Sequence, residues 1–123
     1  MSVQRPTTDR KLNAYLERKE RKRLDVFLNA LRAVMETPEG RFVVWHWLDR
    51  AGINRSVWDA SGMQVHFNAG QQEFGFAMKA DIVATGHDLF ETMNRELREW
   101  ETRVENELAA REQQSRDTAK GEQ

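Results

Sequence analysis

The segment between residues 32 and 52 contains the signals that end one helix and begin another. Thr37 can cap the amino end of a helix by accepting a backbone N–H, and Pro38 suits the first helical position, where no donor is required. Glu39 places negative charge in the first turn, which the helix dipole favours. Gly52 tolerates the left-handed conformation of a helix end. The segment therefore predicts a helix that begins at Pro38 and ends before Gly52.

This helix is dense in large hydrophobic residues, which predicts that it supplies the core. They are Phe42, Val43, Val44, Trp45, Trp47 and Leu48. Trp45 and Trp47 lie about 200° apart around a helix, so one of them should face the connection over residues 53–64, a second layer or another subunit. Tryptophan is enriched at protein interfaces. The candidate partner-binding tryptophans are Trp45, Trp47, Trp58 and Trp100.

The chain before this helix predicts one long helix, or two with a bend. No glycine or proline occurs between Pro6 and Pro38, and residues 6–9 are typical of a loop that ends in an N-cap. A run of seven charged residues then separates the first apolar positions from the later ones. We therefore expect a solvated N-terminal arm over residues 9–23 and a core that begins at Leu24.

A third helix is predicted to begin near Val65 and to end before Gly86. Its apolar stripe consists of Phe67, Gly70, Phe74, Met78 and Ile82. Because glycine disfavours a helix by about 1 kcal/mol relative to alanine, a close approach of a neighbouring helix is expected at Gly70 or Gly75.

The last helix is predicted from about Asp88 to Arg111 and has the clearest apolar spacing. Its seam consists of Phe90, Met93, Leu97, Trp100, Val104 and Leu108. A helix of about 24 residues spans roughly 36 Å, which is longer than the two middle helices can cover. Trp100, Val104 and Leu108 should therefore overhang and pair with the N-terminal arm or with another chain.

A chain of 123 residues suits one domain. We predict an all-α fold of about four helices, with a compact central helical core and projecting N- and C-terminal helices. The single helical domain is expected over residues 9–112, with its core over residues 24–100. Residues 1–8 are predicted to be flexible, and the polar tail over residues 113–123 is predicted to be disordered.

Neither the residue types nor their spacing indicates an enzyme. The chain has no cysteine, which excludes thiolate metal sites and cysteine nucleophiles. Its three histidines lie in different segments without ligand spacing, and no compact catalytic or phosphate-binding motif is present. No apolar run reaches the roughly 18 to 20 residues of a membrane span, and none suits a signal peptide. We predict no enzymatic activity, cofactor, bound metal or membrane anchor.

The net charge of −1 conceals opposite charges at the two ends. Residues 1–36 contain nine Lys/Arg and five Asp/Glu, whereas residues 88–123 contain six and ten. This attraction favours antiparallel packing of the ends in one chain or head-to-tail contact between copies. The nucleic-acid candidates are Arg18, Lys19, Arg21, Lys22 and Arg23. Interrupting glutamates and the lack of stacking aromatics favour a solvated helix face instead.

Four parts of the sequence form a recognisable set. They are L-R-A-V-M-E-T-P-E-G-R-F-V-V-W-H-W-L-D-R-A-G-I at residues 31–53, Trp58, F-N-A-G-Q-Q-E-F-G at residues 67–75 and D-L-F-E-T-M at residues 88–93. Together they resemble a small domain family encoded by tailed bacteriophages and first recognised in a Bordetella podophage. The resemblance runs from about Asp25 to Glu96. It implies a gene near head and portal genes and a role in the virion or its assembly, and it supplies no catalytic residues.

We therefore predict a non-enzymatic structural or assembly protein of a tailed-phage virion. It would act by forming homo-oligomers and by contacting a portal, capsid-interior or ejection component. Its expected location is the virion, and the host cytoplasm during assembly. The alternative is a phage accessory protein that binds nucleic acid or a host protein through the basic run.

Overall fold

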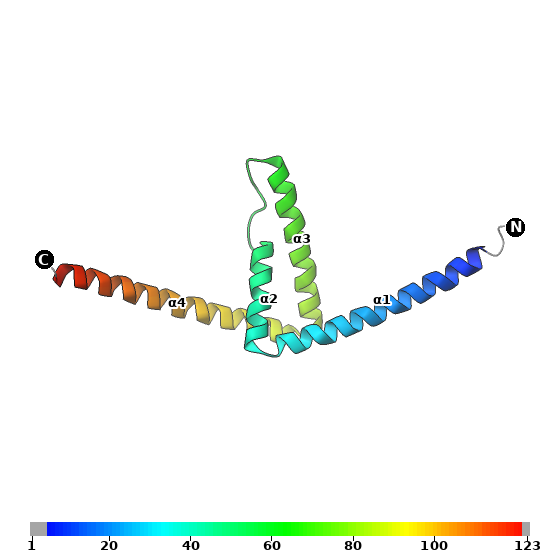
Figure 1. The fold of residues 1–123 in the computed structure, drawn as a ribbon, viewed down its shortest axis with the longest axis horizontal. Helices are drawn as coiled ribbons and strands as arrows, with labels where there is room; N and C mark the ends of the chain where they lie inside the picture. The colour runs from blue at the N-terminus through cyan, green and yellow to red at the C-terminus, as the bar shows by residue number, and fades with distance from the viewer. Residues whose placement is uncertain (1–4, 122–123) are drawn as a thin grey trace.

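The computed structural model describes residues 5–121, and these residues form four α-helices and no strand. The helices are α1 (Arg5–Met35), α2 (Pro38–Ala51), α3 (Gly62–Thr85) and α4 (His87–Gly121). α2 and α3 stand side by side as an antiparallel hairpin, whereas α1 and α4 leave the base of the hairpin on opposite sides (Figure 1). The chain has the predicted all-α fold, with a central core and projecting terminal helices.

The local signals around α2 act as the sequence predicts. The Thr37 Oγ1 atom accepts a hydrogen bond from the Gly40 backbone N–H at 3.0 Å. At the other end, Gly52 adopts a φ of 76°, in the left-handed region. Gly40 has a second role, because a Cβ atom there would lie 1.8 Å from the Val34 carbonyl oxygen. Only glycine therefore lets α2 turn this closely away from α1.

The buried core lies at the base of the hairpin, where all four helices meet (Figure 1). It consists of Met35, Val44, Leu48, Ile82, Met93 and Leu97. Within residues 8–121 no aromatic side chain is buried, so the expected aromatic core in α2 is wrong. Val44 and Leu48 are four residues apart and share the face of α2 that meets the core. Phe42, Val43 and Trp47 lie on its other faces and are exposed, because one narrow hairpin covers only one face of the helix.

α3 approaches the end of α2 closely at Gly75. A Cβ atom at this position would lie 2.7 Å from the Ala51 Cβ atom and 2.6 Å from the Ile53 Cγ2 atom. Gly70 faces open space, because a Cβ atom at this position would have no atom of another element within 4 Å. Of the two glycines expected to permit close packing, Gly75 is the one that does.

Gly75→Ala is expected to destabilise the fold by about 1 to 3 kcal/mol, because the added methyl group overpacks this contact. Gly70→Ala in the same helix is the matched control. It should stabilise the fold by about 0.5 to 1 kcal/mol, because alanine favours a helix and nothing opposes its methyl group. Urea unfolding followed by circular dichroism measures both changes. Equal effects of the two substitutions would contradict the close approach at Gly75.

The amino ends of two helices lie earlier than predicted. α1 begins at Arg5, so the expected loop over residues 6–9 is wrong. Pro6 is tolerated there because the first helical turn needs no N–H donor from it. α3 begins at Gly62, three residues earlier than expected, because the Ser61 side chain caps it. Residues 1–4 lie outside the described residues.

The carboxyl end of the chain is helical rather than disordered. α4 continues to Gly121, so the prediction of a disordered tail is wrong for residues 113–121. No proline or glycine interrupts the tail before Gly121, and side chains one turn apart support it: Gln113 donates to the Asp117 Oδ1 atom at 3.1 Å. Residues 122–123 lie outside the described residues.

Candidate interaction surface

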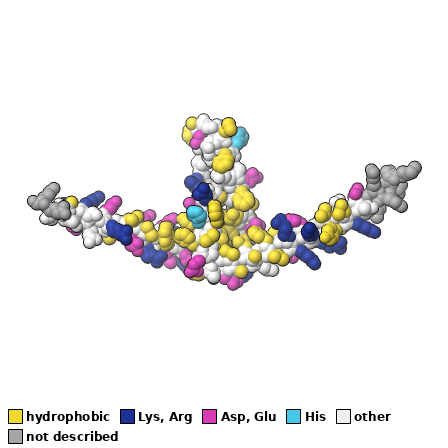
Figure 2. All heavy atoms as spheres, in the orientation of Figure 1, with side chains coloured by type: hydrophobic (Ala, Val, Ile, Leu, Met, Phe, Trp, Pro, Cys, Tyr) yellow, Lys and Arg dark blue, Asp and Glu magenta, His cyan; other side chains and the backbone are white. Residues whose placement is uncertain are grey.

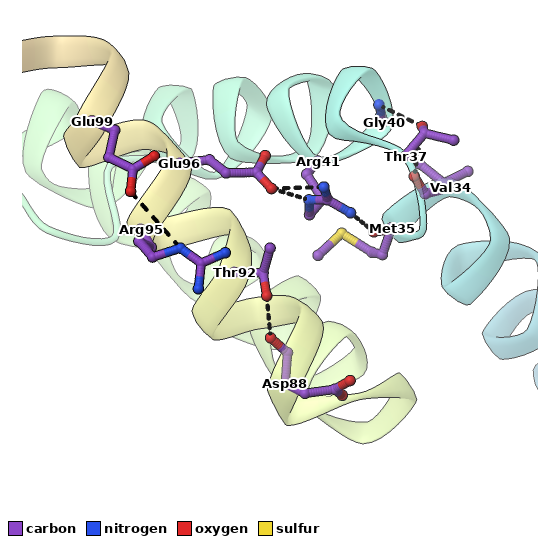
Figure 3. Close-up of polar contacts among 10 residues, drawn as sticks. All are labelled: Val34, Met35, Thr37, Gly40, Arg41, Asp88, Thr92, Arg95, Glu96 and Glu99. Carbon is purple, nitrogen blue, oxygen red and sulfur yellow. Dashed lines mark hydrogen bonds and ion pairs between the residues drawn. The ribbon is translucent and has the colours of Figure 1, made fainter. Parts of the chain in front are cut away.

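Arg41 is the buried charged residue around which three helices join (Figure 3). From α2, its Nη1 atom donates a hydrogen bond to the Met35 carbonyl oxygen at the end of α1, at 2.8 Å. Its Nε and Nη2 atoms donate to the Glu96 Oε1 atom of α4 at 3.0 and 2.6 Å. Arg41 was not among the residues predicted to have a role, although its spacing of three residues from Val44 places it on the buried face of α2.

A second polar contact fixes α1 against the turn between α3 and α4. The Arg32 Nη1 atom donates to the Thr85 carbonyl oxygen at the end of α3, at 2.5 Å. A Cβ atom at Gly86 would lie 2.6 Å from the same Nη1 atom, so the turn has to pass close to the guanidinium. Together with Arg41, this contact sets the directions in which α1 and α4 leave the hairpin.

An aromatic cluster connects α2 and α4 beside the core. The ring centroids of Phe42 and Trp45 are 5.8 Å apart, and Phe42 meets Trp100 edge to face at 5.5 Å. Trp45 is partly buried against the core, whereas Trp100 is 37% exposed. These two candidate tryptophans thus pack between helices of one chain.

An open groove of ≈ 610 Å³ lies between α2 and α3 on the hairpin. Its apolar lining includes Trp47, Phe67 and Phe74, each more than half exposed. Trp47 therefore faces this groove. The opposite wall of the groove is formed by α3 and not by the connection over residues 53–64. Farther out, Trp58 and Met63 are 77% and 85% exposed. Figure 2 shows hydrophobic side chains along the hairpin and at its tip.

The structure does not gather the six predicted partner-binding residues on one surface. Val104 is half-buried and Leu108 exposed, and both lie beyond the core on the projecting part of α4. Trp45 and Trp100 lie at the α2–α4 junction, Trp47 in the groove and Trp58 near the hairpin tip. Phe67 and Phe74 line the groove with Trp47 and were not predicted as partner-binding residues, although both lie on the predicted apolar stripe of the third helix.

All five residues of the predicted basic run are exposed on α1, namely Arg18, Lys19, Arg21, Lys22 and Arg23. Part of this charge is paired within the helix. The Glu17 Oε2 atom lies 4.0 Å from the Arg21 Nη2 atom, and the Arg23 Nη2 atom donates a hydrogen bond to the Glu20 Oε1 atom at 2.5 Å. The hydrogen bond and the charge of Arg23 lower the pKa of Glu20 below its usual value. The basic surface is therefore weaker than the sequence run alone indicates.

Residues 5–121 provide neither a cluster of metal ligands nor a helix suited to span a membrane. Within that range no three His, Cys, Asp or Glu residues are grouped in a way that could hold a metal ion. The three histidines are exposed and lie on α2, α3 and α4. None of the described helices combines the length and hydrophobicity that a membrane span needs.

The fold and its surfaces define a small all-helical protein in which a hairpin and two projecting helices share one compact junction. The model of the family of Bbp19-like phage proteins matches residues 31–94, which is more than half of the 123-residue chain. The chain belongs to this phage protein family, as the resemblance indicated. The match covers the hairpin and part of the junction, and it leaves out most of α1 and all of α4 beyond residue 94, including Glu96 and Leu97. No curated protein and no solved structure matches the chain.

Proposed function

We propose that this phage protein is a non-enzymatic structural or assembly component of the virion, which acts by binding its own copies and another virion protein. The observation that supports the proposal most is the exposure of its hydrophobic residues. Among the described residues, seventeen large hydrophobic side chains are exposed and only six hydrophobic side chains are buried. A surface with so much apolar area suits a protein that functions in an assembly.

The hairpin is the part that suits contact with another virion protein. It lies within the segment that the family shares, and its groove combines Trp47 with Phe67 and Phe74. Exposed aromatic side chains in a groove are typical anchors for a partner's apolar residues. We propose a portal, capsid-interior or ejection protein as this partner, with the protein in the host cytoplasm during assembly and in the virion afterwards.

Mass spectrometry of purified virions tests this proposal. We expect the protein in particles that have been freed of unbound protein, at a constant ratio to the major capsid protein. A phage that carries Trp47→Ser and Phe74→Ser should yield particles depleted of the protein, because the groove loses its aromatic anchors. Phe76→Ser is the matched control, since Phe76 is exposed on the same helix but does not line the groove. Wild-type virions without the protein would contradict the proposal.

The second candidate function is binding of nucleic acid or a host protein through the basic run. The exposure of its five Lys/Arg side chains favours this alternative, whereas the pairing of Arg23 with Glu20 and the net charge of −1 weaken it. An accessory protein of this kind would be missing from virions. Its binding to duplex DNA would fall steeply with salt, as phosphate contacts do.

A further inference from the structure

Two parts of the chain project away from the core and have exposed side chains. They are the N-terminal arm, residues 9–23 of α1, and the C-terminal arm, residues 98–121 of α4, in which Val104 alone is half-buried. At 1.5 Å per residue the arms are about 22 and 36 Å long. They lie on opposite sides of the hairpin base (Figure 1), so the pairing of the two ends within one chain, which their charges allowed, does not occur.

The apolar residues occupy opposite ends of the two arms. On the N-terminal arm, Leu12, Tyr15 and Leu16 lie near the outer tip and are about half exposed. On the C-terminal arm, Trp100 and Leu108, like the half-buried Val104 between them, lie near the root, next to the core. Spacings of three and four residues place each set on one face of its helix. Each arm thus has an apolar stripe that nothing in its own chain covers completely.

The charges of the arms are complementary. Residues 18–23 contain five Lys/Arg and one Glu, whereas residues 99–107 contain four Glu and one Arg. Lys19 and Lys22 follow Leu12 and Tyr15 by seven residues, so they extend the same helix face. On the C-terminal arm, Glu105 and Glu107 lie on either side of the stripe.

We propose that the N-terminal arm of one copy packs beside the C-terminal arm of the next copy, so that the protein assembles head to tail. This inference rests on the proposed virion role and names the second copy as the partner of the arms. α1 runs from its tip toward the core and α4 runs from the core toward its tip. Because the two arms leave the hairpin base on opposite sides (Figure 1), arms of neighbouring copies that overlap side by side run parallel, and the tip of one meets the root of the other.

This parallel arrangement matches both the apolar and the charged parts. With Leu12 level with Trp100, Leu16 comes level with Val104. Lys19 and Lys22 then come level with residues 107 and 110, within about one helical turn of Glu105 and Glu107. In this arrangement the apolar tip lies against the apolar root, and the basic residues lie against the glutamates.

A twofold symmetric dimer through like arms lacks this match. Like arms related by a twofold axis run either antiparallel or parallel. When they run antiparallel and overlap along their length, the apolar tip of each N-terminal arm lies against the basic residues of the other, and the apolar root of each C-terminal arm lies against the polar outer helix over residues 109–121. When they run parallel, the basic residues of two N-terminal arms, or the glutamates of two C-terminal arms, lie against like charges. Head-to-tail contact uses two different surfaces, and repetition of such a contact closes a ring or extends a filament.

Sedimentation of the full chain and its charge variants tests the arrangement. The wild type should be larger than a monomer, and its association should weaken as salt is raised. Lys19→Glu with Lys22→Glu should weaken association at least about tenfold, and Glu105→Lys with Glu107→Lys should do the same, because each puts like charges together. An equimolar mixture of the two variants should recover the wild-type size, because both arm contacts regain opposite charges.

Arg10→Glu with Arg21→Glu is the matched control. It changes the net charge as much as the first pair, but these residues lie on the opposite face of the N-terminal arm, so association should persist. A wild type that is monomeric at every concentration, or a mixture that stays as small as its components, would overturn the head-to-tail contact. So would a symmetric dimer that is insensitive to the glutamate reversal.

Virion composition separates this inference from the proposed function. A protein that is incorporated into virions but is monomeric in solution and insensitive to the arm variants would keep the virion role and overturn the arm contact. Conversely, salt-dependent binding of duplex DNA that Lys19→Glu with Lys22→Glu abolishes, without any change in sedimentation, would assign the basic residues to nucleic acid and overturn the inference.

Discussion

Arg41→Met should lower the free energy of unfolding by about 3 kcal/mol, toward the lower end of the range for breaking a buried ion pair. The substitution leaves the Met35 carbonyl and the Glu96 carboxylate without their donor, and unpaired buried polar groups are costly. The lower end applies because the Glu96 side chain is 28% exposed and water can reach it, whereas that of Arg41 is 9% exposed. Urea unfolding at a concentration where the protein is monomeric measures the loss.

Two further variants separate the ion pair from a simple loss of packing. Arg41→Met combined with Glu96→Leu should recover most of the stability, because replacing both partners by apolar residues leaves no uncompensated charge. Arg95→Met is the matched control, since Arg95 pairs with Glu99 at 3.9 Å on the exposed side of α4. Such a surface pair contributes about 0.2 to 1 kcal/mol. A loss in Arg41→Met no larger than in Arg95→Met would contradict the role of Arg41 at the junction.

The sequence predicts those parts of the fold that depend on neighbouring residues. The cap at Thr37, the glycine end at Gly52 and the four-helix organisation are read from adjacent residues and from helical spacing, and the structure confirms them. The aromatic core was wrong for a different reason. The residue types show that Phe42 and Trp47 are large and apolar. Whether another helix covers these side chains depends on how the hairpin meets the terminal helices, which the residue types do not show.

The same distinction applies to the candidate surface. Spacing on α4 identified the stripe that contains Val104 and Leu108, which lies beyond the core. Spacing alone left open whether this stripe meets the N-terminal arm of the same chain. The contacts of Arg41 and Arg32 settle that point, because they direct α1 and α4 to opposite sides. The Arg41–Glu96 and Arg32–Thr85 contacts join residues 55 and 53 positions apart in the sequence, and helical periodicity does not report them.

Trp45→Ala and Trp47→Ala should destabilise the monomer unequally. Trp45 is partly buried, packs against the core and contacts the Phe42 ring, so its truncation should cost about 3 kcal/mol. Trp47 is 53% exposed in the hairpin groove, so its truncation should cost less than about 1 kcal/mol. Trp45 and Trp47 lie two positions apart on one helix, and both substitutions replace tryptophan by alanine. Each variant is therefore the control for the other.

Urea unfolding of both variants, at a concentration where the wild type is monomeric, measures this difference. Trp45→Ala should shift the midpoint strongly, whereas Trp47→Ala should unfold nearly as the wild type does. The small effect of Trp47→Ala on folding makes it the informative variant for binding, because loss of virion incorporation then reports the groove and not an unfolded chain. Equal destabilisation by the two substitutions would mean that Trp47 packs in the monomer, and would remove the argument that it serves as an interface residue.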